Sequence, residues 1–236
     1  MYKLREKAAV GGCMVMLVAA ANCMAGGMEP ETSILLLNEA DTAGAILLKN
    51  TDERPLLLYS KIENLPEDGD EKPLVMLTPP VARVEAGERQ QVRFMLQLKQ
   101  PLKTQRLKRV IFEGIPQKSR ADRAQVAIAV RQNLPLVIHP KGLSENREPW
   151  KLLKWSLSDG QLTLANDSPY VVRMAQVVNL QPQGTAVQLE RSYVLPGQTL
   201  SFPVTDTGAE AVRLYPATLY GFSVDSYDAP LTAKAG

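Results

Sequence analysis

Two adjacent acidic pairs and one histidine are the first candidates in this chain for side chains that transfer protons. The acidic pairs, at 67–68 and 70–71, share a short segment with proline and glycine, and His139 is the single histidine. Neither feature is accompanied by a glycine-rich phosphate loop or a nucleophile-elbow motif. We therefore predict that the acidic pairs are solvated turn charges, that His139 lies at a domain junction, and that the chain is not an enzyme.

Both cysteines, Cys13 and Cys23, lie in an N-terminal segment with a basic start at 3–7, an apolar run and small residues up to Ala25. This order is typical of a secretory signal peptide, and we expect residues 1–25 to be removed on export. The exported chain would then have no cysteine, which excludes a disulfide and a cysteine-rich zinc site. We expect neither a metal nor a cofactor. A lipid on Cys23 is an open alternative.

The charge balance is nearly neutral. The formal net charge is +2, with 27 basic and 25 acidic residues and no block of like charges. A nucleic-acid partner would favour a basic patch or stripe, so this distribution argues against one.

The most regular pattern in the chain runs from Ala124 to Ile138. Successive side chains of a strand point to opposite faces, so large aliphatic residues here share one face and small or charged residues share the other. The aliphatic row is Val126, Ile128 and Val130, and the opposite row is Ala127, Ala129 and Arg131. This pattern fits a core strand. It fits equally a strand that is held out for another protein.

Strand-like runs with turn residues between them fill the rest of the chain, and no run has a sustained helical period. The segment His139–Gly142 divides these runs into two sets, because proline ends a strand and glycine lets the chain redirect. We therefore predict an all-β chain of two β-sandwiches, at 26–140 and 141–236, with a single large barrel as the alternative. The expected strands are 33–37, 45–49, 56–63, 74–77, 90–98, 107–112, 125–138, 150–157, 161–165, 170–179, 187–194, 199–204, 211–216 and 218–223.

Three stretches, in this order behind an export signal, carry a family resemblance. They are TPPVARVEAGERQQVRF at 78–94, RLKRVIFEGIP at 106–116 leading to the strand end LVIHP, and NDSPYVV at 166–172. Together they resemble the periplasmic chaperones of the chaperone–usher pilus pathway, over nearly the whole chain from about 30 to 230. The resemblance implies two immunoglobulin-like domains in a boomerang and a location in the periplasm.

The same resemblance implies a partner and a mechanism. Such chaperones lend a strand to a pilus subunit whose own sandwich lacks one, which is a known mode of β-strand addition. Matching LVIHP to the family's strand end makes Val126, Ile128 and Val130 the donated side chains. An outer-membrane usher is the implied second partner, and self-capping of the free protein as a homodimer is left open.

The chain departs from the family at the residues that hold the subunit's terminal carboxylate. The family uses two basic residues, one on the first strand and one on the long strand. The first-strand region 31–39 has no arginine or lysine here, and the long-strand position is Pro135. Arg131 is the nearest basic residue on that strand, and a guanidinium suits a carboxylate, so Arg131 is our candidate anchor. For the interdomain contact the resemblance suggests His139, with Asp225 as its partner.

Two further expectations remain open at this point. The short segment after Pro116 and the absence of a disulfide resemble the short-loop branch of the family. The competing functions are a surface-displayed adhesin or lipoprotein and a carbohydrate-binding module, whose sites need exposed aromatic rings. Trp150 and Trp155 are the two tryptophans, and their spacing on one strand places them on opposite faces, so we expect one of them in the core.

Overall fold

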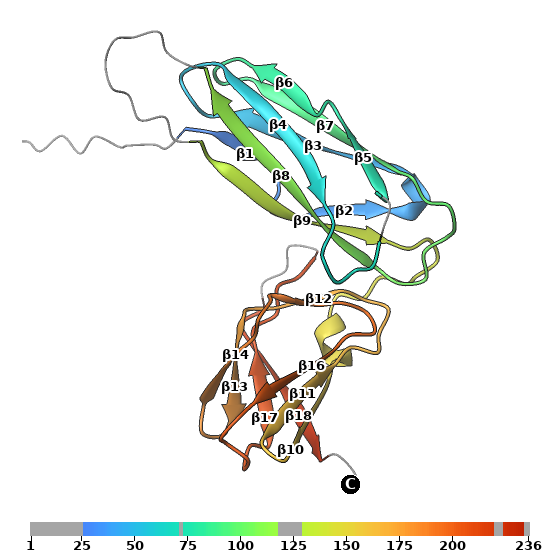
Figure 1. Cartoon of the computed structure of the whole chain (residues 1–236), viewed down its shortest axis with the longest axis vertical. Helices are drawn as coiled ribbons and strands as arrows, with labels where there is room; N and C mark the ends of the chain where they lie inside the picture. The colour runs from blue at the N-terminus through green and yellow to red at the C-terminus, as the bar shows by residue number, and fades with distance from the viewer. Residues whose placement is uncertain (1–25, 71–72, 118–128, 220–223, 234–236) are drawn as a thin grey trace, which may run out of the picture.

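The computed structural model describes residues 26–70, 73–117, 129–219 and 224–233. These residues form two elongated β lobes that meet at an angle (Figure 1). The first lobe has its own buried core around Phe94 and Phe112, and the second has another around Trp155 and Leu180. Separate cores rule out the single-barrel alternative and confirm the all-β class with two immunoglobulin-like sandwiches.

The first lobe packs two sheets against each other. One has the order β1-β3-β7-β5 and the other β2-β9-β8-β4-β6. Alternating apolar residues of both sheets fill the space between them, such as Val92 and Phe94 on β7 and Val110 and Phe112 on β8. The strands are β1 (Met28–Pro30), β2 (Leu35–Asn38), β3 (Ala43–Asn50), β4 (Leu56–Glu63), β5 (Val75–Thr78), β6 (Val81–Val84), β7 (Arg89–Leu96), β8 (Arg106–Pro116) and β9 (Arg131–His139).

The second lobe consists of a seven-stranded sheet, in the order β14-β13-β17-β18-β10-β11-β16, and the short pair β12-β15. Its strands are β10 (Lys154–Ser158), β11 (Gln161–Ala165), β12 (Val172–Arg173), β13 (Val177–Gln181), β14 (Thr185–Gln188), β15 (Tyr193–Val194), β16 (Thr199–Pro203), β17 (Ala211–Leu214) and β18 (Tyr227–Ala233). The short 3-10 turns η1 (Glu39–Asp41) and η2 (Pro149–Leu152) are the helical elements of the described ranges. Neither has the length to cross a membrane.

The expected strands 56–63 and 161–165 have the predicted bounds, and β5 ends at Thr78 where two prolines follow. Other expectations were wrong. The strands β1, β6 and β18 were missed, and 170–179 and 187–194 are each divided into two short strands. The two halves of each run belong to different sheets, because β12 pairs with β15 in a separate two-stranded sheet whereas β13 and β14 pair within the seven-stranded sheet. Of the expected strand 218–223, residues 218–219 are not in a strand, and the rest lies outside the described residues.

Both tryptophans are buried, so the expectation that only one lies in the core was wrong. The reason is local. Trp150 belongs to the 3-10 turn η2, which begins with Pro149, and not to the strand that carries Trp155. Strand alternation therefore does not apply to the pair, and both rings enter the second core. This removes both tryptophans as an exposed aromatic platform.

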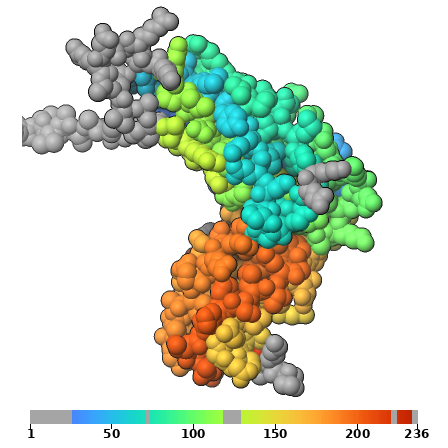
Figure 2. All heavy atoms as spheres, viewed as in Figure 1, coloured from blue at the N-terminus to red at the C-terminus, as the bar shows by residue number. Residues whose placement is uncertain are grey.

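The two lobes meet through a small apolar cluster of their own. Leu65, Leu107 and Val137 come from the first lobe, and Val171, Leu195 and Leu219 come from the second. Figure 2 shows the molecule bending at this junction, with a concave side between the lobes. Leu107 on β8 and Val137 on β9 lie opposite each other in the strand register, so these two strands reach the junction together.

Candidate functional site

Strand β9 has one edge that is only partly paired. On one side β8 pairs with β9 from Arg131 to Ile138. On the other side β2 pairs with β9 in parallel, from Leu136 to His139 only. No strand of the described residues pairs with the second edge of 131–135. Unpaired backbone groups on such an edge are a template for an added strand.

The predicted donor side chains lie at and before the start of β9. Val126 and Ile128 fall outside the described residues. Val130 is partly buried, its carbonyl accepts a hydrogen bond from the Gly114 N–H at 3.4 Å, and its side chain lies against Gly27. The donor assignment of these three residues therefore stays a prediction, as does the short-loop interpretation, which also rests on this segment.

The predicted anchor Arg131 lies at the start of β9, at the end remote from the junction. Its guanidinium is half exposed and forms an ion pair with Glu63 at 3.2 Å. Glu63 also contacts Lys61 at 2.6 Å. The hydrogen bond from Lys61 and the nearby positive charges hold the pKa of the Glu63 carboxyl below its usual value. Arg131 thus shares the single carboxylate of Glu63 with Lys61, and its role as anchor stays a prediction.

His139 contributes to the junction, but through a partner that the sequence did not suggest. Its Nδ1 lies 2.9 Å from the Gln105 side-chain nitrogen, and its Nε2 lies 2.8 Å from the Leu143 carbonyl. Gln105 also forms two hydrogen bonds with the second lobe. Its side-chain Oε1 accepts from the Val171 N–H at 2.9 Å, and its backbone N–H donates to the Pro169 carbonyl at 2.8 Å. These contacts fit the tautomer in which Nδ1 accepts from the Gln105 side-chain amide and Nε2 donates to the Leu143 carbonyl.

Asp225 is exposed, and the described residues show no hydrogen bond or ion pair between it and His139. Both ring nitrogens already face other groups. The contact between the lobes thus runs from His139 through Gln105 to the backbone of 169–171. Gln105 is distant from His139 in the sequence, so no local pattern predicts that the two side chains meet.

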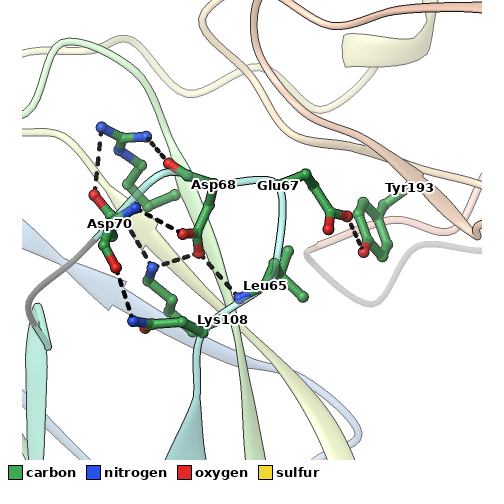
Figure 3. A network of polar contacts seen from close by, with 8 residues as sticks. Leu65, Glu67, Asp68, Asp70, Lys108 and Tyr193 are labelled. Atoms are coloured by element: carbon green, nitrogen blue, oxygen red, sulfur yellow. Dashed lines mark hydrogen bonds and ion pairs between the residues drawn. The ribbon is translucent and has the colours of Figure 1, made fainter.

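The acidic loop at 65–70 is not a set of solvated turn charges, and that expectation was wrong. Asp68 and Asp70 both contact the Nζ of Lys108, the second at 2.7 Å (Figure 3). The Lys108 side chain is fully buried. Strand alternation places it on the same face of β8 as Val110 and Phe112, which belong to the core. A buried ammonium needs paired carboxylates, and the loop supplies them.

The same loop reaches the second lobe. Glu67 accepts a hydrogen bond from the Tyr193 hydroxyl (Figure 3). Glu67 also forms an ion pair with Arg191 at 2.9 Å. Burial, with the neighbouring Glu67 carboxylate as a further cause, raises the pKa of Tyr193 to about 12. The segment 65–70 therefore connects a buried charge network of the first lobe to the surface of the second.

Apolar side chains gather on the outer face of the sheet that contains β4, β6 and β8. Leu57, Tyr59, Val81 and Ile115 are exposed. They are neighbours by strand register, since Tyr59 lies opposite Val81 and Leu57 opposite Ile115. Exposed apolar side chains that gather on one face make this face a candidate surface for contact with another protein. Within the described residues there is no group of three or more side chains suited to hold a metal ion.

Comparison with known proteins gives one consistent answer. The family model described as pili and flagellar-assembly chaperone, PapD N-terminal domain, matches residues 27–144. The model described as pili assembly chaperone PapD, C-terminal domain, matches residues 148–226. The chain is 42% identical over 213 residues to the uncharacterized fimbrial chaperone YhcA of Escherichia coli K12, across 90% of this chain and 94% of the relative.

Solved structures share the fold. The SafB chaperone, in complex with the SafA pilin of Salmonella enterica, has a TM-score of 0.71 at 17% identity and covers 87% of this chain and 96% of its own. The chaperone CsuC, in a pre-assembly complex with the tip subunit CsuE of Acinetobacter baumannii, has a TM-score of 0.64 at 18% identity and covers 88% and 99%. The surface-adhesin alternative finds no support among these matches. The chain belongs to the family of pilus-assembly chaperones.

Proposed function

We propose that this chain works in the periplasm, where it binds pilus subunits by strand donation and passes them to an outer-membrane usher. The observation that carries the proposal is the unpaired edge of β9 at 131–135, directly after the predicted donor residues. A subunit that lacks a strand exposes unpaired backbone and an apolar groove, and an added strand satisfies both. Burying Val126, Ile128 and Val130 would contribute roughly 1.5–3 kcal/mol each before ordering costs.

The second partner needs a surface that a bound subunit leaves free. The exposed cluster of Leu57, Tyr59, Val81 and Ile115 lies on β4, β6 and β8, away from the open edge of β9 in the sheet order. This position supports binding of the usher while the subunit is held. In the absence of a subunit, the open edge of β9 also supports pairing between two copies of the chain.

The test uses co-expression with a pilus subunit that accumulates in the periplasm only when the wild-type chain is present. Replacing Ile128→Asp places a charge in the donated row and should abolish accumulation of the subunit in periplasmic extracts. Ala129→Asp is the matched control, because Ala129 lies on the opposite face of the predicted strand and is exposed. Both variants should remain soluble. Normal subunit levels with Ile128→Asp would overturn the strand-donation proposal.

The usher step has its own readout in the same cells. Leu57→Glu should leave periplasmic subunit levels unchanged and stop the appearance of subunit at the cell surface. Unchanged surface display would exclude the apolar cluster as the usher contact.

A further inference from the structure

We propose that the junction between the lobes contains a pH switch, formed by His139, Gln105 and the backbone N–H of Val171. The switch is closed while the imidazole is neutral, and it loses a hydrogen bond when the ring takes up a proton. It belongs to the free chain, and so it lies beyond the proposed function and does not depend on it.

The two ends of this hydrogen-bond chain fix the direction of every bond in it. At one end the Leu143 carbonyl can only accept, so the His139 Nε2 that lies 2.8 Å away has to carry a proton. At the other end the Val171 N–H can only donate, and the Gln105 Oε1 accepts it at 2.9 Å. The Gln105 side-chain nitrogen is then left to donate to the His139 Nδ1 at 2.9 Å. An accepting Nδ1 carries no proton, so the chain of bonds needs the neutral imidazole.

A proton on the His139 Nδ1 breaks this chain. The charged ring has donors on both nitrogens, so Nδ1 would face the donating amide nitrogen of Gln105. Turning the amide over would give Nδ1 an acceptor, but it would place the amide nitrogen against the Val171 N–H, which is also a donor. Each response costs one hydrogen bond, and the second removes the side-chain bond between the lobes.

Burial makes the loss costly at Gln105 and leaves His139 open to protonation. Gln105 is 1% exposed and Val171 is 0% exposed, so solvent water does not readily replace a lost partner. His139 is only partly buried, at the end of β9, and its ring can exchange protons with solvent. Val171 also packs in the apolar junction cluster, which places the switch inside the interface between the lobes.

Among the described residues, no carboxylate forms an ion pair with His139 that would retain a proton on the ring. Charged side chains on the adjoining elements are Glu39 and Asp41 on η1, Lys103 and Arg106 beside Gln105, Lys141 and Glu145 beside Leu143, and Asp167 and Arg173 beside 169–171.

Glu39 is the acidic residue nearest to the ring in strand register. It follows Asn38, which lies opposite His139, and its carboxylate accepts from the backbone N–H groups of Leu102 and Lys141 at 3.2 and 2.8 Å. The negative charge of Glu39 favours a charged ring and the positive charge of Lys141 opposes it. Neither group supplies an acceptor at Nδ1, so the direction of the switch is set by the Gln105 amide.

The closed junction is the state that binds the proton less well. Once the bond from Gln105 is broken, the His139 Nδ1 is free to carry a proton and meet water. The closed junction is therefore favoured at neutral pH, and the open one gains population as the pH falls through the range in which imidazole changes its charge, about pH 5 to 8. The apolar cluster and the bond from the Gln105 N–H to the Pro169 carbonyl do not involve this proton, so the lobes stay joined while the junction loosens.

Hydrogen exchange at the Val171 amide tests the switch, because this N–H is the group that loses its partner. Its protection factor, corrected for the intrinsic pH dependence of exchange, should fall several-fold to about tenfold between about pH 7.5 and 5.5. The amides of β8 in the first core are the internal control and should keep their protection. His139→Asn keeps an acceptor at the δ position that cannot be protonated, so its Val171 protection should be the same at both pH values.

Gln105→Glu should reverse the sign. Its carboxylate can accept from the Val171 N–H with one oxygen and from a protonated His139 Nδ1 with the other, and glutamate stays ionised down to about pH 5. Protection at Val171 should therefore rise in this variant as the pH falls from about 7.5 to 5.5.

Three outcomes would overturn the proposal. The first is a Val171 protection factor that is equal at both pH values in the wild-type chain, or that falls only together with those of the β8 amides. The second is an equal fall in His139→Asn, and the third is a fall in Gln105→Glu. Circular dichroism checks that each variant is folded, and the wild-type comparison of Val171 with β8 decides the question by itself where a variant does not fold.

Discussion

Lys108 and Arg109 are neighbours on β8, yet the structure treats their charges in opposite ways. Lys108 points into the first lobe, is fully buried and contacts two carboxylates. Arg109 points to the opposite face of the strand, is partly buried, and donates to the neutral side chain and carbonyl of Asn133. Alternation along one strand thus separates a buried cation that has two carboxylate partners from a partly buried cation that has no ion pair among the described residues. A buried cation is tolerated in the core when its anions are supplied, and removing one partner leaves an uncompensated buried charge.

The largest effect is expected at Lys108. Lys108→Met keeps the length of the side chain but leaves Asp68 and Asp70 without their cation. The free energy of unfolding should fall by about 3–5 kcal/mol, as for other buried ion pairs that lose one partner. Urea unfolding of the purified chain measures this.

A second variant keeps that prediction decisive. Adding Asp68→Asn and Asp70→Asn to Lys108→Met removes the orphaned charges and should recover part of the loss. An unchanged unfolding midpoint in Lys108→Met would mean that the network is not structural, and the contrast with Arg109 would fail.

A smaller effect is expected where the acidic loop meets the second lobe. Burial and the contact with Glu67 raise the pKa of Tyr193 from 10.0 to about 12. Below pH 10 the phenol is protonated in both the folded and the unfolded state, so its contribution is fully present. As the pH rises from 10 to 12 the unfolded state ionises first, and the contribution is lost. Because the ring is partly exposed, the loss should be about 1 kcal/mol.

Alkaline unfolding curves check this sign. Stability of the wild-type chain should decline more steeply between pH 10 and 12 than that of Tyr193→Phe. Tyr215→Phe is the control, since Tyr215 is exposed and bonds Asn179 within the second lobe. Equal slopes for all three proteins would show that Glu67 and Tyr193 do not couple the lobes.

The same contrast explains what the sequence could reveal. Period-two alternation located β4 because apolar and polar residues alternate clearly over 56–63. The same alternation did not show that Lys108 is buried while its basic neighbours are not. The run RLKR at 106–109 is rich in charge and looks like a solvent-exposed segment. The available signal was that Lys108 shares its face with Val110 and Phe112. The carboxylates that make this tolerable lie 38 and 40 positions away along the chain, beyond any local pattern.

The proximity of Arg109 and Arg173 could not be predicted from the sequence for a related reason. Arg173 directly follows the stretch NDSPYVV, which served to identify the family, but nothing local shows that it faces Arg109. That placement depends on how Leu107 and Val171 pack between the lobes. The predicted domain division at 139–142 rests on proline and glycine, whereas the angle between the lobes depends on tertiary packing.

The smallest effect on stability is expected at the arginines themselves. Arg109→Met and Arg173→Met retain much of the apolar stem and remove a charge that is partly desolvated without an ion pair. Each should change the free energy of unfolding by less than about 1 kcal/mol, because the lost contacts with neutral groups are offset by relief of like-charge repulsion. Urea unfolding beside Lys108→Met makes the comparison direct. A loss of several kcal/mol in either variant would show that this arginine, like Lys108, is a structural charge. The contrast between the two faces of β8 would then fail.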